Sequence, residues 1–139
     1  MAPRLGGCLC GNVRYVAVGE PVSVSICHCG SCRKSAGAPS VAWASFALVD
    51  FRITKGAMTT YASSPGVQRR HCGACGTCLT FHERGEETID ITLASLDDPD
   101  QLCPTKEIWL SHRLAWEVVS RERTGFEEGS PTLDRGLIP

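Results

Sequence analysis

Seven of the nine cysteines in this 139-residue chain fall into three short clusters with spacings suited to binding metal. An odd number of cysteines, in a sequence whose start lacks an apolar signal segment, argues against a disulfide framework. Thiolates that ligate a metal ion are therefore the better interpretation. The clusters are Cys8-Leu-Cys10, Cys27-His-Cys29-Gly-Ser-Cys32 and Cys72-Gly-Ala-Cys75.

The first and third clusters each offer two thiolates. Zinc takes four ligands in a tetrahedron, and two separate turns commonly supply two thiolates each. Cys8 with Cys10, and Cys72 with Cys75, are such half-sites, and a glycine that permits a tight turn follows each pair. We expect the four thiolates to form one closed structural zinc site that joins the N-terminal strand to the middle of the chain.

The middle cluster offers three thiolates from one loop, namely Cys27, Cys29 and Cys32. Three protein ligands with one open position are typical of a catalytic zinc site, in which the metal lowers the pKa of a bound thiol or water. The adjacent Arg33 and Lys34 would favour an anionic ligand there.

Spacing alone leaves other metal sites open. A second structural site completed by Cys78, Cys103 or a histidine is as compatible with the middle cluster as a catalytic one. An iron–sulfur cluster on Cys72, Cys75, Cys78 and Cys103 is a weaker alternative. His28 lies between two ligand positions, so on an extended backbone it should point away from the metal.

The segments between the clusters are short and rich in β-branched and aromatic residues, with Gly, Pro, Ser or Asp at their ends. No long window has helical apolar spacing, although residues 31–37 could form one helical turn that stops at a glycine. The predicted fold class is mainly β with antiparallel sheets, and residues 107–119 are expected to be strand or irregular. Strands are expected at 11–18, 21–26, 40–47, 51–54, 58–61, 67–71, 78–82 and 88–93.

Length and hydrophobic content indicate a single domain over residues 1–139, with a core of about 6–118 and a tail of 119–139. The end of that tail, residues 127–139, is expected to be a loosely held surface segment. The net charge of −1 and scattered basic residues argue against a nucleic-acid partner, and no apolar stretch is long enough to cross a membrane. We expect a cytoplasmic protein.

Several large side chains are expected to be structural rather than functional. Arg69 and its neighbour Arg70 suggest a solvated turn. The aromatic side chains Trp43, Phe46, Trp109 and Trp116 are expected to pack in the core.

Four segments of the sequence together resemble the glutathione-dependent formaldehyde-activating enzymes, also called the GFA or centromere-protein-V type domain. The resemblance covers residues 6–118 and implies small β-sheets around a zinc site, as in the Mss4-like group. It also implies formation of S-hydroxymethylglutathione from formaldehyde and glutathione, the reaction of a carbon–sulfur lyase. The segments are GGCLCGNVRY, CHCGSCRKSAGAP, HCGACGTCLTF and TLASLDDPD.

The resemblance also implies roles for the cysteines. By position, Cys8, Cys10, Cys72 and Cys75 match the family's structural zinc ligands. Three further cysteines match the ligands of a second zinc assigned to catalysis; they are Cys27, Cys29 and Cys32. The implied partner is a small thiol such as glutathione, and a homo-oligomer is left open.

The chain departs from the family pattern at two positions. Glu107 stands where the family usually has a histidine before Ile-Trp, and Cys78 is added to the usual GT-x-L pattern. The exact substrate is therefore left open. Two alternative functions remain, a non-catalytic zinc-stabilised binding module and a methionine sulfoxide reductase-like enzyme, and the latter would need Cys78 and Cys103 as reactive thiols.

Overall fold

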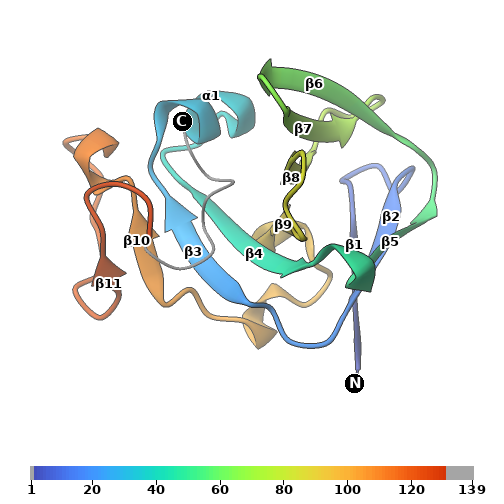
Figure 1. The fold of residues 1–139 in the computed structure, drawn as a ribbon, viewed down its shortest axis with the longest axis horizontal. Helices are drawn as coiled ribbons and strands as arrows, with labels where there is room; N and C mark the ends of the chain where they lie inside the picture. The colour runs from blue at the N-terminus through green and yellow to red at the C-terminus, as the bar shows by residue number, and fades with distance from the viewer. Residues whose placement is uncertain (1, 131–139) are drawn as a thin grey trace.

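The computed structural model describes residues 2–130, and most of its regular structure is β-strand (Figure 1). A small sheet has the strand order β1-β2-β5, and a large sheet has the order β11-β10-β3-β4-β9-β8-β7-β6. The small sheet comprises β1 (Pro3–Gly7), β2 (Arg14–Val18) and β5 (Phe51–Lys55). The large sheet comprises β3 (Ser23–Cys27), β4 (Val41–Ala47), β6 (Met58–Ser64), β7 (Val67–Cys72), β8 (Cys78–Glu83), β9 (Thr88–Thr92), β10 (Lys106–Ile108) and β11 (Thr124–Gly125).

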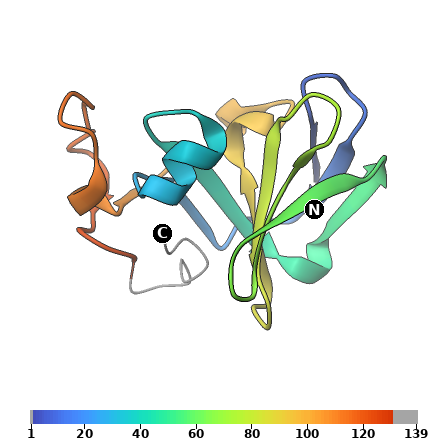
Figure 2. The same ribbon diagram turned by 90° about the horizontal axis from the view of Figure 1, so that it is seen from above.

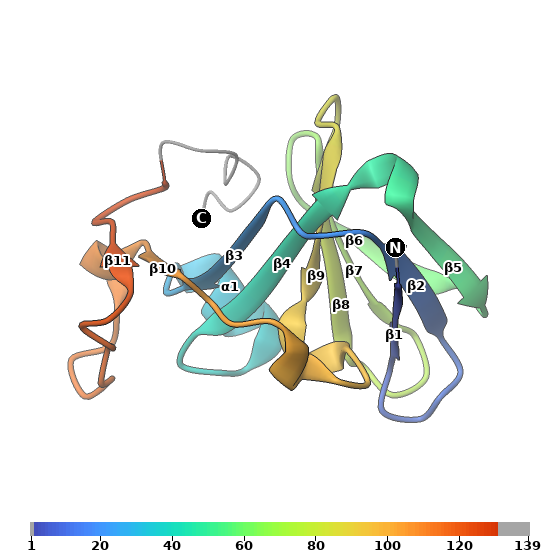
Figure 3. The ribbon, with the colours of Figure 1, turned by 90° about the horizontal axis from the view of Figure 1, so that it is seen from below.

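The predicted mainly β class is confirmed, and so is the helical turn, which forms α1 (Gly30–Ala36) and ends at Gly37 in the left-handed conformation. Four short 3-10 turns connect strands within the described residues: η1 (Leu48–Asp50), η2 (Leu93–Ser95), η3 (Pro99–Gln101) and η4 (Leu110–His112). Figures 2 and 3 show the small sheet at one end of the molecule and the β10–β11 edge at the other. The helix α1 lies between these ends, beside β3 and β4.

Sequence reasoning missed β1, whose residues Pro-Arg-Leu-Gly-Gly have low strand propensity. Pairing with β2 makes it a strand, because all five of its residues have partners there. A glycine is required at one point: a Cβ on Gly6 would lie 2.4 Å from the Tyr15 hydroxyl oxygen. Glycine thus lowers the strand propensity of β1 and also allows its close packing.

Two clusters of buried side chains form the core, and each contains one group of cysteines. Along β4, Ala44 and Phe46 pack in the first cluster, with Cys8 and Cys72. Trp43 points to the other face of the strand and packs in the second, with Phe81, Ile108, Cys27, Cys29 and Cys32. Because side chains alternate between the two faces of β4, this one strand packs against both groups of cysteines.

The C-terminal part of the large sheet differs from expectation. Strand β10 pairs in parallel with β3, and β11 pairs in parallel with β10, so this edge is not antiparallel. Beyond β11, Phe126 N–H donates to the Glu107 carbonyl (2.8 Å) and Trp109 N–H to the Glu128 carbonyl (2.9 Å). The expectation of a loosely held segment is wrong for residues 127–130, and residues 131–139 of that segment lie outside the described part.

The aromatic residues divide between core and surface. Trp43 and Phe46 are fully buried, and Trp109 packs partly buried against the second cluster, as predicted. Trp116 is 69% exposed, so its predicted core position is wrong. Within residues 2–130, no helix has both the length and the apolar character needed to cross a membrane.

Candidate metal centres

Cys8, Cys10, Cys72 and Cys75 come together, although 62 residues separate the two inner members. Their four Sγ atoms all lie within 4.8 Å of one another. The first pair lies in the loop between β1 and β2, and the second pair lies at the end of β7 and in the turn to β8. This four-cysteine cluster therefore links the small sheet to the large one.

Each pair sits in a tight turn closed by a glycine, as the sequence predicts. Gly11 has φ 79° and its N–H donates to the Cys8 carbonyl (3.1 Å). Gly76 has φ 80° and its N–H donates to the Cys72 carbonyl (2.9 Å). A residue with a Cβ would be strained at such φ values. In both half-sites, therefore, a left-handed glycine bonds back to the carbonyl of the first cysteine, three residues back at Gly11 and four at Gly76.

Backbone donors and one hydroxyl surround these sulfurs. Val13 N–H donates to Cys8 Sγ (3.2 Å), and Cys75 N–H donates to Cys72 Sγ (3.4 Å). Thr77 Oγ1 accepts from Leu9 N–H (3.0 Å) and lies 3.2 Å from Cys75 Sγ, so it bonds to both half-sites. Hydrogen bonds from the Thr77 hydroxyl and backbone lower the pKa of Cys75 to about 5. Such donors favour thiolates, the form that ligates zinc.

The three-cysteine cluster consists of Cys27, Cys29 and Cys32, which are fully buried. Their Sγ atoms also lie within 4.8 Å of one another. Cys27 ends β3, and Cys29 caps the N-terminus of α1, its Sγ accepting from Cys32 N–H (3.3 Å). All three therefore come from one strand-to-helix turn, packed against Trp43 and Phe81.

The electrostatics of this cluster suit a divalent cation. Hydrogen bonds from the Cys27 and Cys32 thiols lower the pKa of Cys29 to about 3. The bonds that Cys27 makes with those two sulfurs, together with burial, raise its own pKa. One thiolate is thus favoured, whereas three need a positive charge among them. Buried thiols at this mutual distance fit zinc.

The structure separates the alternatives for the remaining cysteines. Within residues 2–130, no histidine, carboxylate or fourth cysteine joins the three-cysteine cluster as a ligand. Cys78 is half-buried in β8, and the exposed Cys103 has its Sγ 3.6 Å from the Pro104 carbonyl oxygen. The iron–sulfur grouping is wrong, because Cys72 and Cys75 cluster with Cys8 and Cys10 instead. The predicted completion by Cys78, Cys103 or a histidine is also not found in the described part.

Arg69 contacts the three-cysteine cluster, so its predicted place in a solvated turn is wrong. It is 6% exposed, and its Nη1 and Nη2 lie 3.7 and 3.8 Å from Cys32 Sγ. Its guanidinium carbon lies 4.8 Å from the centroid of the Phe81 ring. Strand alternation offered a signal, because Arg69 shares a face of β7 with the buried Val67.

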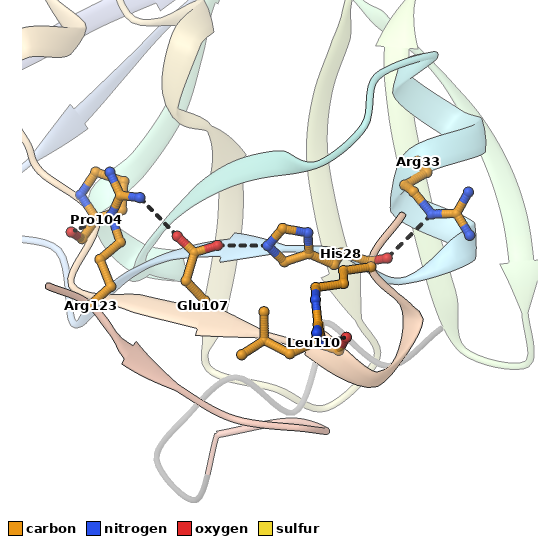
Figure 4. A network of polar contacts seen from close by, with 7 residues as sticks. His28, Arg33, Pro104, Glu107, Leu110 and Arg123 are labelled. Carbon is orange, nitrogen blue, oxygen red and sulfur yellow. Dashed lines mark hydrogen bonds and ion pairs between the residues drawn. The ribbon is translucent and has the colours of Figure 1, made fainter. Parts of the chain in front are cut away.

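His28 points away from the neighbouring sulfurs, as predicted, into a buried polar network (Figure 4). His28 Nε2 lies 2.6 Å from Glu107 Oε1, and Arg123 Nη1 donates to Glu107 Oε2 (2.8 Å). His28 and Glu107 are 1% and 2% exposed. On the helix side, Arg33 Nε donates to the His28 carbonyl (3.3 Å). The network thus joins the three-cysteine turn to β10 and to the segment before β11.

Arg123 had no sequence signal, because it lies in the expected tail. Glu107 did have one, since it replaces a histidine in the resemblance drawn from the sequence. In the structure its carboxylate pairs with two basic side chains, His28 and Arg123.

Comparison with known proteins gives a consistent result. The family described as glutathione-dependent formaldehyde-activating enzyme matches residues 3–112. An uncharacterised lyase of Schizosaccharomyces pombe is 33% identical over 83 residues, which cover 55% of this chain and 55% of the relative, so the chain spans about half of that relative's length. A crystal structure of a Rhodobacter sphaeroides protein matches with a TM-score of 0.57 and 26% identity, over 67% of this chain and 87% of the other.

Proposed function

The chain belongs to the family of glutathione-dependent formaldehyde-activating enzymes, and we propose that it is a zinc-dependent carbon–sulfur lyase. Its proposed substrate is the adduct of a small aldehyde with a glutathione-like thiol. The supporting observation is the three-cysteine cluster, three buried sulfurs with no fourth protein ligand within residues 2–130. A site with three protein ligands leaves a position for substrate.

In this proposal the two clusters have different roles. Cys27, Cys29 and Cys32 hold the working zinc ion, and the four-cysteine cluster holds a structural one. When bound at the three-cysteine cluster, zinc stabilises a thiolate or polarises an aldehyde oxygen at neutral pH. The hydrogen bond from Cys32 N–H to Cys29 Sγ orients one ligand sulfur before any metal binds.

The reaction itself requires little acid–base chemistry. The sulfur of the thiol forms a bond to the aldehyde carbon, the carbonyl π bond breaks, and the thiol proton ends on the new hydroxyl oxygen. The lyase direction reverses each of these changes. Holding both reactants in a buried, apolar surrounding beside the Arg69 cation would account for most of the acceleration.

The proposal includes the expected setting of the protein. We propose a cytoplasmic location, because the proposed chemistry needs reduced thiols. A small thiol is the proposed partner. A homo-oligomer is left open, and nucleic acid is not expected.

Metal analysis combined with turnover tests the function. We expect two zinc ions per chain, and an exchange rate between formaldehyde and S-hydroxymethylglutathione, measured by NMR, above the spontaneous rate. Cys29→Ser should remove one zinc ion and reduce the exchange to the spontaneous rate. Cys103→Ser, at an exposed position, is the control and should keep two zinc ions and the full rate. Two tightly bound zinc ions with only the spontaneous rate would support the non-catalytic binding module instead.

A further inference from the structure

A pocket of about 360 Å³ lies between α1 and the β6–β7 hairpin. Figure 1 shows α1 and this hairpin facing each other along one side of the molecule. The volume falls at the lower end of the range for small-molecule sites, roughly 300–1,000 Å³. Six residues line it: Ser31, Lys34, Ser35, Tyr61, Ser63 and Arg69.

The lining has the chemistry of an anion site. Lys34 and Arg69 are cations, the other four side chains carry hydroxyl groups, and none of the six is acidic. A carboxylate can accept hydrogen bonds from all of these groups, and charge-assisted bonds to arginine and lysine are the strong ones. A neutral or cationic ligand would gain less from the same lining.

Arg69 is the fixed part of this pocket. It is more than nine-tenths buried, and its Nε has no hydrogen-bond partner within residues 2–130. Its Nη1 lies 3.4 Å from Ser35 Oγ, and it pairs across the strands with Tyr61 on β6 and Phe81 on β8. A guanidinium that lines a pocket and is held in place by such neighbours loses little side-chain freedom when it binds an anion.

Arg69 also belongs to the three-cysteine cluster through its contacts with Cys32 Sγ. Three thiolates with one zinc ion leave one net negative charge, and a bound substrate thiolate would add another. Arg69 offsets part of this charge in a buried surrounding, where it would be costly. One side chain therefore connects the pocket to the metal centre.

We propose that this pocket binds a carboxylate of an anionic thiol of about tripeptide size, whose sulfur reaches the three-cysteine centre. The inference rests on the proposed function and adds to it the place and charge of the substrate. Lys34, at the solvent side, attracts the carboxylate, and Arg69 holds it beside Cys32.

Calorimetry on the zinc-loaded protein tests the pocket without any reaction. The probe is S-methylglutathione, which keeps both carboxylates but cannot form the adduct, and its diethyl ester lacks both charges. We expect roughly tenfold weaker binding for Arg69→Gln and roughly threefold for Lys34→Gln, as for the loss of charge-assisted hydrogen bonds. The diethyl ester should bind the protein weakly and respond little to either variant.

Arg70→Gln is the matched control, since Arg70 is the next residue of β7 and its Nη2 donates to Gln68 Oε1 (2.7 Å) outside the pocket. It should bind the probe as the unaltered protein does. Lys34 is exposed on α1, so Lys34→Gln keeps the test decisive if Arg69→Gln fails to fold.

The outcomes separate this inference from the proposed function. The proposed carboxylate-binding role of the pocket is overturned by any of three results: equal binding of probe and ester, no binding of the probe, or no effect of Lys34→Gln. Each result would do so even if the protein turns over S-hydroxymethylglutathione. Charge-dependent binding in a protein without turnover would support the pocket and count against the lyase.

Discussion

The two cysteine clusters use the same ligand atoms but are built in different ways. The four-cysteine cluster draws on two loops from two sheets, and its members Cys10 and Cys75 are accessible to solvent. The three-cysteine cluster comes from one strand-to-helix turn and is fully buried. The four-cysteine cluster therefore fixes how distant parts of the chain are arranged. The three-cysteine cluster is instead positioned by the fold around its strand-to-helix turn.

Because of this difference, we expect metals at the two clusters to contribute unequally to the free energy of unfolding. Closing a link across 62 residues removes much freedom from the unfolded chain, whereas linking Cys27 to Cys32 removes little. The small sheet also packs on the large one through core side chains such as Tyr15 and Ala17, but its backbone makes an isolated bridge between Gly6 and Leu96 rather than a ladder. A metal at the four-cysteine cluster should thus stabilise the fold, and a metal at the three-cysteine cluster should mainly serve chemistry.

The largest expected effect follows from breaking each cluster in turn. Cys72→Ser should cost several kcal/mol, enough to unfold a domain whose total stability is about 5–15 kcal/mol. Cys29→Ser should cost only about 1–2 kcal/mol, because serine can also cap a helix. Urea unfolding followed by circular dichroism measures both values.

The roles given to the two clusters are wrong if Cys29→Ser costs more stability than Cys72→Ser. A Cys29→Ser protein that unfolds while Cys72→Ser stays folded with one zinc would show that the buried cluster holds the structure. Zinc content measured on the same samples identifies which site each substitution has emptied.

The sequence predicted the cysteine groups well because their information is local. Two ligands separated by one or two residues, followed by a glycine, specify a turn whatever the rest of the chain does. The positive φ of Gly11 and Gly76 agrees with this. The strands were predicted for a similar reason, since alternation and turn residues are read within a few positions.

The surroundings of the clusters were not predicted, because they depend on register between distant strands. Arg69 reaches Cys32 only because β7 lies in the large sheet opposite α1. Glu107 meets His28 through the parallel pairing of β10 with β3, 79 residues away in sequence. Neither pairing is visible in local composition, so the sequence placed Arg69 in a solvated turn and marked Glu107 only as a departure from the family pattern.

A smaller effect is expected from the network beside the three-cysteine cluster. Glu107→Gln removes the charge that pairs with Arg123 and His28 while keeping the size of the side chain. It should cost about 1–3 kcal/mol, the usual penalty for leaving buried polar groups without their partner. It should also speed zinc release from the three-cysteine cluster, measured with a chromogenic chelator, and leave the four-cysteine cluster unchanged.

Glu127→Gln is the control for that experiment, because Glu127 is exposed on the same C-terminal segment. If both zinc ions leave Glu107→Gln protein faster by the same factor, the network supports the whole fold rather than one cluster. The role given to Glu107 beside the three-cysteine turn would then be wrong.

The smallest effect concerns an ion pair near the four-cysteine cluster. Arg14 of β2 donates two hydrogen bonds to Asp97, and these bonds hold the pKa of that carboxyl below its usual value. A lowered pKa in the folded state means that the pair stabilises the protein above the pKa of the unfolded chain, and that this contribution is lost as pH falls through the folded value.

Asp97→Asn should therefore lower stability at neutral pH by at most about 1 kcal/mol, since the Arg14 and Asp97 side chains are 33% and 50% exposed and salt screens them. Unfolding measured at pH 7 and near pH 3 should show the difference from unaltered protein shrinking at the lower pH, whereas Asp100→Asn should show no such trend. A loss as large as that of Cys72→Ser would mean that the ion pair, rather than the zinc thiolates, holds the small sheet in place.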